Sequence, residues 1–336
     1  MILDLKVAVI TGITGALGKG IFLRLVNEFP AIKIYGTARS SKRAGEALCS
    51  FIEEDIRLSK RIENKDLILI PAEFDTMDIK KVQDFSQLLH QEKRIDLLFL
   101  NAGTIISNGL YWSAAALQLL TDIRHDGKSC TPDGISKSFS TNVYGHYLLA
   151  EFLQDLLASS ADARVVWVGS SEGEQRFFDS SDFEGRNSIN PYGSNKFCLY
   201  IISQFLNKRY QRQKLSIRSI VTAPGILPSN IAASMVPSIF IPFLAPFFWI
   251  LRFFLNIEEL TIDAHSAAEA IIYTATVPLE QLYIEKRADS VCSRLGAPSV
   301  CLTAVPFISV DLETKLYEYL LKLNSKFGIH LNTKHA

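Results

Sequence analysis

Short runs of apolar residues alternate with longer segments of mixed polarity over the first two thirds of the chain. Continuous apolarity over a few residues indicates strands that are buried on both faces, and the longer segments between them are typical of helices. The expected strands lie at 6–11, 32–37, 67–71, 95–101, 164–169 and 217–222. The expected helices lie near 17–28, 42–58, 78–90, 134–158 and 192–212.

This alternation of strand and helix predicts an α/β fold of the Rossmann type, a doubly wound parallel sheet. We expect a single domain over 1–336, with a core (1–225), an apolar lid or membrane-contact segment (226–262) and a C-terminal extension (263–336). In such sheets, ligands bind outside the carboxyl ends of the strands, where the strand order reverses. The functional residues should therefore lie in the loops that follow the strands.

The C-terminal extension carries two further elements. The run PSVCLTAVPFISV at 298–310 is interpreted as a closing strand of the same sheet. From residue 311 onward, apolar residues recur at helical spacing, which predicts a helix with a packing stripe that ends near Gly328.

Composition narrows the function classes. The 35 basic and 35 acidic residues balance, so no basic surface for nucleic acid is expected. The five cysteines are scattered and odd in number, which favours reduced thiols in a cytosol-facing protein. No Cys/His spacing is typical of a metal site, so we expect no metal, and His146 is interpreted as a packed helix residue.

A glycine-rich loop follows the first expected strand. TGITGALGKG places Gly12, Gly15 and Gly18 at the start of a helix, flanked by Thr11 and Leu17. Glycines there let backbone N–H groups approach a pyrophosphate at the helix N-terminus. A tight turn alone would use the same residues, so the strand before the loop is what favours a dinucleotide site.

The end of the second expected strand favours NADP(H). A dinucleotide site reads the adenosine ribose there, with an acidic residue for NAD or a basic one for the 2′-phosphate of NADP. GTARSSKR offers Arg39, Lys42 and Arg43 and no acid at the strand end. A basic helix start opposes the helix dipole, so it has no stabilising role of its own.

Tyr192 and Lys196 stand four residues apart in NPYGSNK, at the start of an expected helix. Such residues share one helix face. A Tyr has an unperturbed pKa of about 10, so proton transfer near neutral pH would need a nearby positive charge, which Lys196 could supply. The spacing alone is commonplace, and other strand ends must support it.

Four further strand ends or helices carry polar or small residues. A hydroxyl from Ser170 or Ser171 could hydrogen-bond a substrate carbonyl. The remaining candidates are Asn101, Ala102 and Gly103 after the fourth strand, Asn142 in the next helix, and Pro224 and Gly225 after the sixth strand.

Together these motifs resemble the short-chain dehydrogenase/reductase family over residues 6–230. The resemblance implies an NADP-dependent oxidoreductase in which Tyr192 is the acid/base and Lys196 its pKa partner and ribose ligand. It also implies Ser171 as carbonyl orienter, with Ser170 as the alternative, Asn142 as the link in a proton relay and Asp75 as an adenine contact. Ala16 departs from the family's usual middle glycine, which leaves the loop geometry open.

Segments outside this common core resemble the 3-keto-steroid reductase branch, which includes type-7 17β-hydroxysteroid dehydrogenase. They include NGLYWSAAALQLLTD and LRFFLNIEELTIDAHSAAEA. The resemblance implies reduction of a 3-keto or 17-keto group on a sterol or steroid by NADPH, at the cytosolic side of the endoplasmic reticulum membrane. Another lipid carbonyl (3-ketoacyl or retinoid), a non-catalytic NADP-binding scaffold, a homodimer and association with other sterol-pathway enzymes remain open.

The apolar segment 235–251 is nearly as long as a membrane-spanning helix. Pro237, Pro242 and Pro246 are expected to break any continuous helix. We therefore favour a hairpin of short helices over the substrate entrance that dips into one leaflet, with Arg252 and Lys286 in water. A true span and a protein-packed loop are the alternatives.

Overall fold

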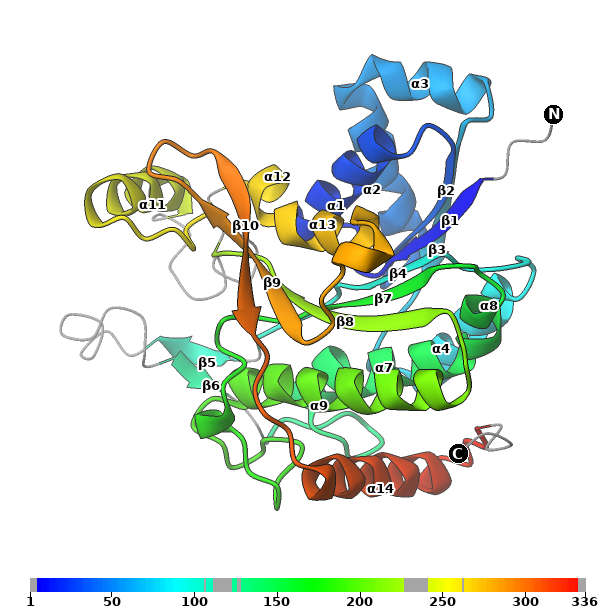
Figure 1. Ribbon diagram of the computed structural model, residues 1–336, viewed down its shortest axis with the longest axis vertical. Coiled ribbons are helices and arrows are strands. Elements are labelled where there is room, and N and C mark those ends of the chain that lie inside the picture. Colours follow the sequence, from blue (N-terminus) through cyan, green and yellow to red (C-terminus); the bar gives the residue numbers. More distant parts are fainter. Residues whose placement is uncertain are drawn as a thin grey trace.

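An eight-stranded sheet forms the centre of the computed structural model, which describes residues 5–105, 107–110, 123–125, 128–226, 241–261 and 263–331. Its strand order is β10-β9-β8-β7-β4-β1-β2-β3 (Figure 1). These strands are β1 (Lys6–Ile10), β2 (Ile32–Ala38), β3 (Leu67–Glu73), β4 (Leu97–Leu100), β7 (Ala163–Val168), β8 (Ile217–Ala223), β9 (Lys286–Cys292) and β10 (Pro298–Ala304). A separate hairpin joins β5 (Ser107–Leu110) and β6 (Ile123–His125).

The strand order reverses at β1, as a doubly wound sheet requires. β1 pairs in parallel with β2 on one side and with β4 on the other. β10 is antiparallel to β9, which itself runs parallel to β8. The predicted fold class and all six expected core strands are therefore confirmed, and the carboxyl ends of β1 and β4 meet at the switch point.

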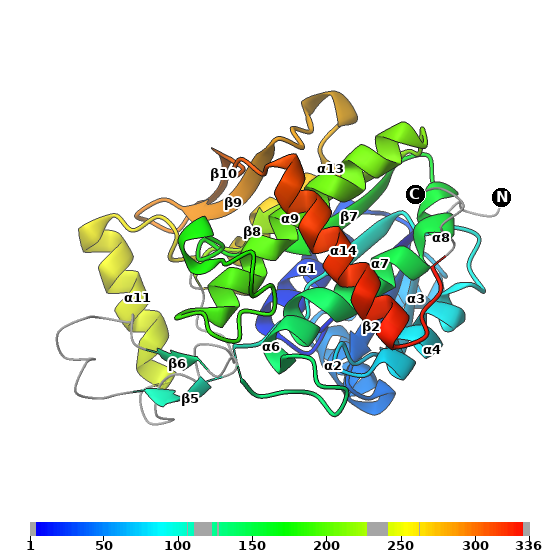
Figure 2. The same ribbon diagram turned by 90° about the horizontal axis from the view of Figure 1, so that it is seen from below.

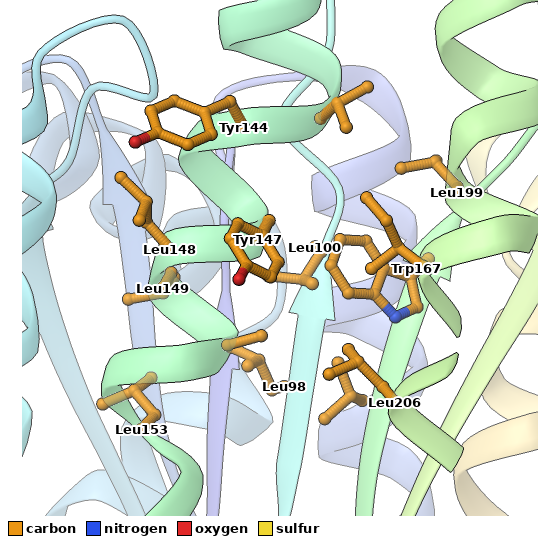
Figure 3. Close-up of a cluster of buried hydrophobic side chains, with 14 of the residues drawn as sticks. Leu98, Leu100, Tyr144, Tyr147, Leu148, Leu149, Leu153, Trp167, Leu199 and Leu206 are labelled. Carbon is orange, nitrogen blue, oxygen red and sulfur yellow. The ribbon is translucent and has the colours of Figure 1, made fainter. Parts of the chain in front are cut away.

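Helices cover both faces of the sheet (Figure 1). One face carries α4, α7 and α9, and the other carries α1, α2 and α13. Figure 3 shows how side chains from β4, β7, α7 and α9 interlock in the first layer, around the fully buried Trp167. The main helices are α1 (Ala16–Glu28), α2 (Ser41–Glu54), α3 (Ile56–Glu63), α4 (Ile79–Leu89), α6 (Lys137–Phe139), α7 (Gly145–Phe152), α8 (Gln154–Ala158), α9 (Pro191–Arg212), α11 (Ile241–Leu255), α12 (Ala264–Ala267), α13 (Glu269–Thr276) and α14 (Val310–Lys326).

The C-terminal helix α14 lies across α9 and α7 on the outer side of that layer (Figure 2). The Lys208 ammonium binds the Glu313 carboxylate at 2.6 Å, and the Tyr144 hydroxyl donates to Asn324 Oδ1 at 2.9 Å. The apolar stripe is buried against this layer, and Gly328 follows the helix with a φ of 64°. The predicted helix, its packing stripe and its stop are confirmed.

Two expected helices are divided. The segment 42–58 is broken at Asp55, whose extended backbone ends α2 and whose carboxylate accepts the Arg57 N–H at the start of α3. The segment 134–158 contains α6, a π-helical turn at Ser140–Tyr144, α7 and α8. Helical periodicity does not reveal either break, because both depend on local capping and hydrogen bonding.

The closing strand is confirmed for residues 298–304, as β10. Its partner β9 was not expected, because KRADSVC is polar in sequence and only every second residue is buried. β9 and β10 therefore form a hairpin that extends the sheet, and β9 joins this hairpin to the core by pairing with β8.

The apolar segment differs from expectation at two points. Residues 241–255 form one helix, α11, which continues through Pro246, so the expectation that this proline breaks the helix was wrong. The Arg252 side chain is buried and donates to the Leu260 carbonyl at 3.2 Å, so it does not lie in water. Lys286 is exposed, as expected. Pro237 and the first part of the expected hairpin lie outside the described residues, and Pro242 lies in the first turn of α11 and does not break it, contrary to expectation.

Candidate active site

The loop after β1 is shaped by two glycines. Gly12 has a φ of 74°, and a Cβ there would lie 3.0 Å from Ala102 Cα. A Cβ on Gly18 would lie 2.3 Å from the Gly12 carbonyl oxygen. Gly15 is less constrained, because its Cβ would meet the same oxygen at an ordinary 3.5 Å. The loop therefore turns tightly at Gly12, and α1 packs directly onto it at Gly18.

The N-terminus of α1 has no side-chain cap. Gly15 is the N-cap residue, Ala16 begins the helix, and its first turn contains no acidic residue. Leu17 is half-buried beside this turn. The backbone N–H groups at a helix start have no acceptor within the helix, and they favour an anion. This end of α1 can receive a phosphate.

Thr11 joins this loop to the end of β4. Its Oγ1 accepts the N–H groups of Asn101 (2.8 Å) and Ala102 (2.9 Å), and the Asn101 side-chain amide donates to the Thr11 carbonyl at 2.8 Å. His146 Nε2 lies 3.0 Å from the same Oγ1. Burial, and secondarily the nearby Lys196, lower the pKa of His146 to about 3, so the ring is neutral. His146 is packed, as expected, but its link to Thr11 was missed.

The end of β2 presents a basic side chain to solvent. Arg39 follows the strand directly and is exposed, and no carboxylate in the described part of the chain forms an ion pair with it. Ser40 caps α2 by accepting the Arg43 N–H at 3.4 Å. Lys42 pairs with Glu46 on the exposed helix surface at 3.9 Å. Of the three basic candidates, Arg39 is the one at the strand end.

Asp75 lies in the loop after β3 and is half-buried. Its Oδ1 accepts the Met77 N–H at 3.0 Å, which leaves the other carboxylate oxygen for a further partner.

Tyr192 and Lys196 occupy the first turns of α9, where they share one face. Asn190 caps the helix by accepting the Gly193 N–H at 2.9 Å, and Pro191 occupies a first-turn position. The Lys196 ammonium lies 5.4 Å from the centre of the Tyr192 ring and donates to the Val168 carbonyl at 2.7 Å. The end of β7 thus holds the lysine beside the tyrosine.

Ser170 faces this pair. Its hydroxyl lies close enough to the Tyr192 phenol to lower the pKa of that phenol, and its Oγ accepts the Glu172 N–H at 3.2 Å. Ser171, the next residue, is exposed at the start of a turn. Of the two serines that sequence reasoning left open, the structure brings Ser170 to the tyrosine.

Burial dominates the ionisation of both groups. It raises the pKa of Tyr192 above its ordinary value, the Glu172 carboxylate adds to this, and the Ser170 hydrogen bond opposes it. Burial also lowers the pKa of Lys196 to about 7. Burial, Glu172 and Ser170 are the groups that set the pKa of Tyr192 in the described structure, and the expected influence of Lys196 on the phenolate stays a prediction. Tyr192 therefore keeps its proton at neutral pH.

Asn142 lies in the π-helical turn and is buried. Its side-chain amide donates to the carbonyls of Thr104 and Ser138, both at 2.9 Å, and its Oδ1 accepts the Thr104 N–H at 3.2 Å. A Cβ on Gly103 would lie 3.0 Å from this Oδ1 and 3.7 Å from Lys196 Nζ. Asn142 and Lys196 thus flank the Asn101–Gly103 turn.

Pro224 and Gly225 follow the end of β8 and lie beside residues 259–261. A Cβ on Gly225 would lie 2.3 Å from Thr261 Cγ2, and the Ile226 N–H donates to the Glu259 carbonyl at 2.6 Å. The strand end is therefore fixed by close backbone packing.

The described residues contain no group of three or more His, Cys, Asp or Glu side chains that could hold a metal ion. They also contain no helix with the length and apolarity needed to cross a membrane.

The sequence model of the short chain dehydrogenase family matches residues 6–238. The chain belongs to this family. The match covers every strand end described above up to β8, and it makes the protein an oxidoreductase.

Curated relatives extend the similarity to nearly the whole chain. The 3-keto-steroid reductase/17-beta-hydroxysteroid dehydrogenase 7 of Homo sapiens is 26% identical, over 96% of this chain and 95% of the relative. The 3-keto-steroid reductase erg27 of Schizosaccharomyces pombe is 25% identical, over 95% and 96%. Retinol dehydrogenase 14 of Mus musculus is 29% identical, but over 67% of this chain and 62% of its own length.

Solved structures support the fold. An uncharacterised protein from Mycobacterium paratuberculosis superimposes with a TM-score of 0.61 over 96% of both chains, at 18% identity. A metagenomic short-chain oxidoreductase, solved in complex with NADP, gives a TM-score of 0.53 over 84% of this chain and 96% of its own, at 14% identity.

The lowered pKa of Lys196 predicts one lysine that titrates far below the others. Its amine should be charged below pH 7 and neutral above it, whereas exposed lysines titrate near pH 10.4. NMR of protein labelled at the lysine side chains should resolve one signal with a midpoint near pH 7, absent from Lys196→Met. A wild-type spectrum in which every lysine titrates above pH 9 would contradict the prediction.

Proposed function

We propose that this protein reduces a ketone on a sterol or steroid, with NADPH as cofactor and Tyr192 as proton donor. The observation that carries the proposal is the triad at the carboxyl ends of β4 and β7. The Ser170 hydroxyl lies beside the Tyr192 phenol and lowers its pKa, and the Lys196 ammonium is held near the Tyr192 ring by the Val168 carbonyl. A substrate oxygen that meets both hydroxyls would be oriented by one and protonated by the other.

The described residues fit a dinucleotide phosphate. The start of α1 suits the pyrophosphate, because no side chain caps its backbone N–H groups and its first turn carries no acidic residue. The exposed, unpaired Arg39 suits the 2′-phosphate of NADP, and Asp75 suits the adenine. Lys196 and the Asn101–Gly103 turn would hold the nicotinamide ribose.

The reaction needs one proton and one hydride for each ketone. When bound, NADPH supplies the hydride. Ser170 holds the carbonyl oxygen, and Tyr192 gives its Oη proton to that oxygen as negative charge develops. The raised pKa of Tyr192 keeps this proton in place until charge appears on the substrate. Lys196 then stabilises the phenolate, and the Asn142 network lies along the route by which water returns the proton.

Substrate class follows from the extent of the similarity. The two 3-keto-steroid reductase relatives match this chain over 95% or more of both partners, including α11, β9 and β10. The retinol dehydrogenase match covers 62% of that relative. A steroid or sterol ketone is therefore favoured, in either the 3-keto or the 17-keto position, over a retinoid. A non-catalytic scaffold is disfavoured because Ser170, Tyr192 and Lys196 are all present.

The function is tested by turnover on a panel of ketones. Wild-type protein with NADPH should reduce 3-keto or 17-keto steroids faster than retinal or a 3-ketoacyl thioester. Tyr192→Phe should lose about 100-fold or more of this activity, because the transferred proton is gone, while NADPH binding by fluorescence is kept. If the protein reduced retinal and no steroid, the substrate would be a retinoid and not a steroid ketone. A Tyr192→Phe variant that kept its activity would overturn the role of the tyrosine.

Ser170 and Ser171 form a matched pair. Ser170→Ala should lower kcat by about 100-fold or more, because it removes a hydroxyl from the position of the developing oxyanion. Ser171→Ala should stay within about threefold of wild type, because its hydroxyl is exposed. The reverse ranking would return the role to Ser171.

Cofactor choice is tested at Arg39. Arg39→Asp should raise the KM for NADPH by about tenfold or more, because one charge-assisted contact to the 2′-phosphate is lost, and should change the KM for NADH little. Lys42→Asp, on the exposed face of α2, serves as the control for net charge. A wild type that prefers NADH would refute the NADP assignment.

We also propose that α11 lies in one leaflet of the endoplasmic reticulum membrane, on its cytosolic side. Phe243, Phe247, Ile250 and Phe254 follow one helix face and are 41–71% exposed. On the opposite face Phe248 and Arg252 are buried, and Arg252 fixes the helix to Leu260. A helix with an anchored inner face and an aromatic outer face suits an interface.

Vesicle flotation tests this surface. Wild-type protein should float with phosphatidylcholine vesicles, and a triple Phe→Ser variant at 243, 247 and 254 should lose most of this binding. The matched control changes three exposed apolar residues elsewhere, Ile56, Leu88 and Ile189, to Ser and should still float. Equal flotation of both variants would exclude α11 as the contact, and terminal tags protected on opposite sides of a microsome would exclude one-leaflet binding.

A further inference from the structure

Ser170 lies at the first position of a short turn, and its orientation depends on that turn. The Gly173 N–H donates to the Ser170 carbonyl at 3.1 Å, and the Glu172 N–H donates to Ser170 Oγ at 3.2 Å. The hydroxyl can meet Tyr192 only while this turn keeps its place at the end of β7.

Arg287, at the start of β9, reaches the turn from outside the core of the fold. Its Nη1 donates to the Ser170 carbonyl at 3.4 Å and to the Tyr200 hydroxyl oxygen at 2.6 Å. Its Nε and Nη2 both bind the carboxylate of Asp289, the latter at 2.7 Å. Thr303 of β10 donates to the same carboxylate at 2.9 Å. Both strands of the hairpin therefore fix the guanidinium.

Tyr200 closes the other side of the turn. It lies on α9, four residues after Lys196, so it shares a helix face with the lysine and with Tyr192. A Cβ on Gly173 would lie 3.1 Å from the Tyr200 ring and 3.2 Å from both the Lys196 backbone and the Ser170 carbonyl oxygen. The turn is thus held between the Tyr200 ring and Arg287, with little space for a side chain at Gly173.

We propose that Arg287 is a positioning residue, which acts through Ser170 by fixing this turn. The bidentate pair with Asp289 neutralises the guanidinium charge, so its effect on Tyr192 is geometric. The donors of Arg287 are spread over three nitrogens and so reach Asp289, Tyr200 and the Ser170 carbonyl at once, whereas a Lys carries its donors on one nitrogen and can replace only some of these contacts. The role of Ser170 in ketone reduction rests on the proposed function. The contacts by which Arg287 holds the turn, called the clamp below, do not depend on that function.

Kinetics test the action on Ser170. Arg287→Gln should lower kcat for the ketone by about tenfold or more, with the KM and the NADPH affinity within about threefold of wild type, because a small displacement of a catalytic group slows the chemical step. Arg287→Lys should recover part of the loss. The double variant Ser170→Ala/Arg287→Gln should be no slower than Ser170→Ala alone. Multiplied losses in the double variant, or an unchanged kcat in Arg287→Gln, would overturn the proposal.

Hydrogen exchange tests the clamp without turnover. In Arg287→Gln the amides of Glu172 and Gly173 should exchange about tenfold faster than in wild type, because their acceptors on Ser170 are no longer held. Lys286→Gln, which removes the neighbouring exposed charge, should leave these amides unchanged. Unchanged exchange in Arg287→Gln would refute the clamp. Faster exchange in a protein whose wild type reduces no ketone would support the clamp and refute the proposed function instead.

Discussion

The site depends on one hydrogen bond, from the buried Lys196 ammonium to the Val168 carbonyl at 2.7 Å. An ammonium removed from water is costly, and no carboxylate in the described ranges pairs with this one. The lowered pKa of Lys196 reflects that cost. In return, α9 is tied to the end of β7, which places Tyr192 one helical turn away beside Ser170. An anionic ligand bound nearby would raise the pKa of Lys196 again, because it favours the charged amine.

Most of this site could be predicted from the sequence, because a parallel sheet brings all its strand ends to one edge. Thr11 and Gly12 are far from Asn101 in the chain, yet strand–helix alternation already implies that the two loops meet. The four-residue spacing of Tyr192 and Lys196 likewise predicts a shared helix face. These inferences need only the periodicity of side chains along a helix or strand and the order of strands and helices along the chain.

What the sequence could not provide depends on the path of the backbone between elements. Ser170 and Ser171 are chemically identical, and only the turn after β7 decides which of them faces Tyr192. His146 and Arg287 reach the site from α7 and β9, through contacts that no local pattern encodes. Pro246 removes one hydrogen bond from α11, but tertiary contacts such as that of Arg252 keep the helix continuous.

The position of α14 has a consequence for how the protein stays folded as a single chain. Most of α9 from Phe197 to Leu206 is apolar and buried, because the sheet covers one side of the helix and α14 packs on another. A chain that ended before α14 would leave this surface open to water, together with the unpaired Tyr144 hydroxyl. The last helix therefore covers an apolar face of the core, and its removal would expose that face to water and favour aggregation.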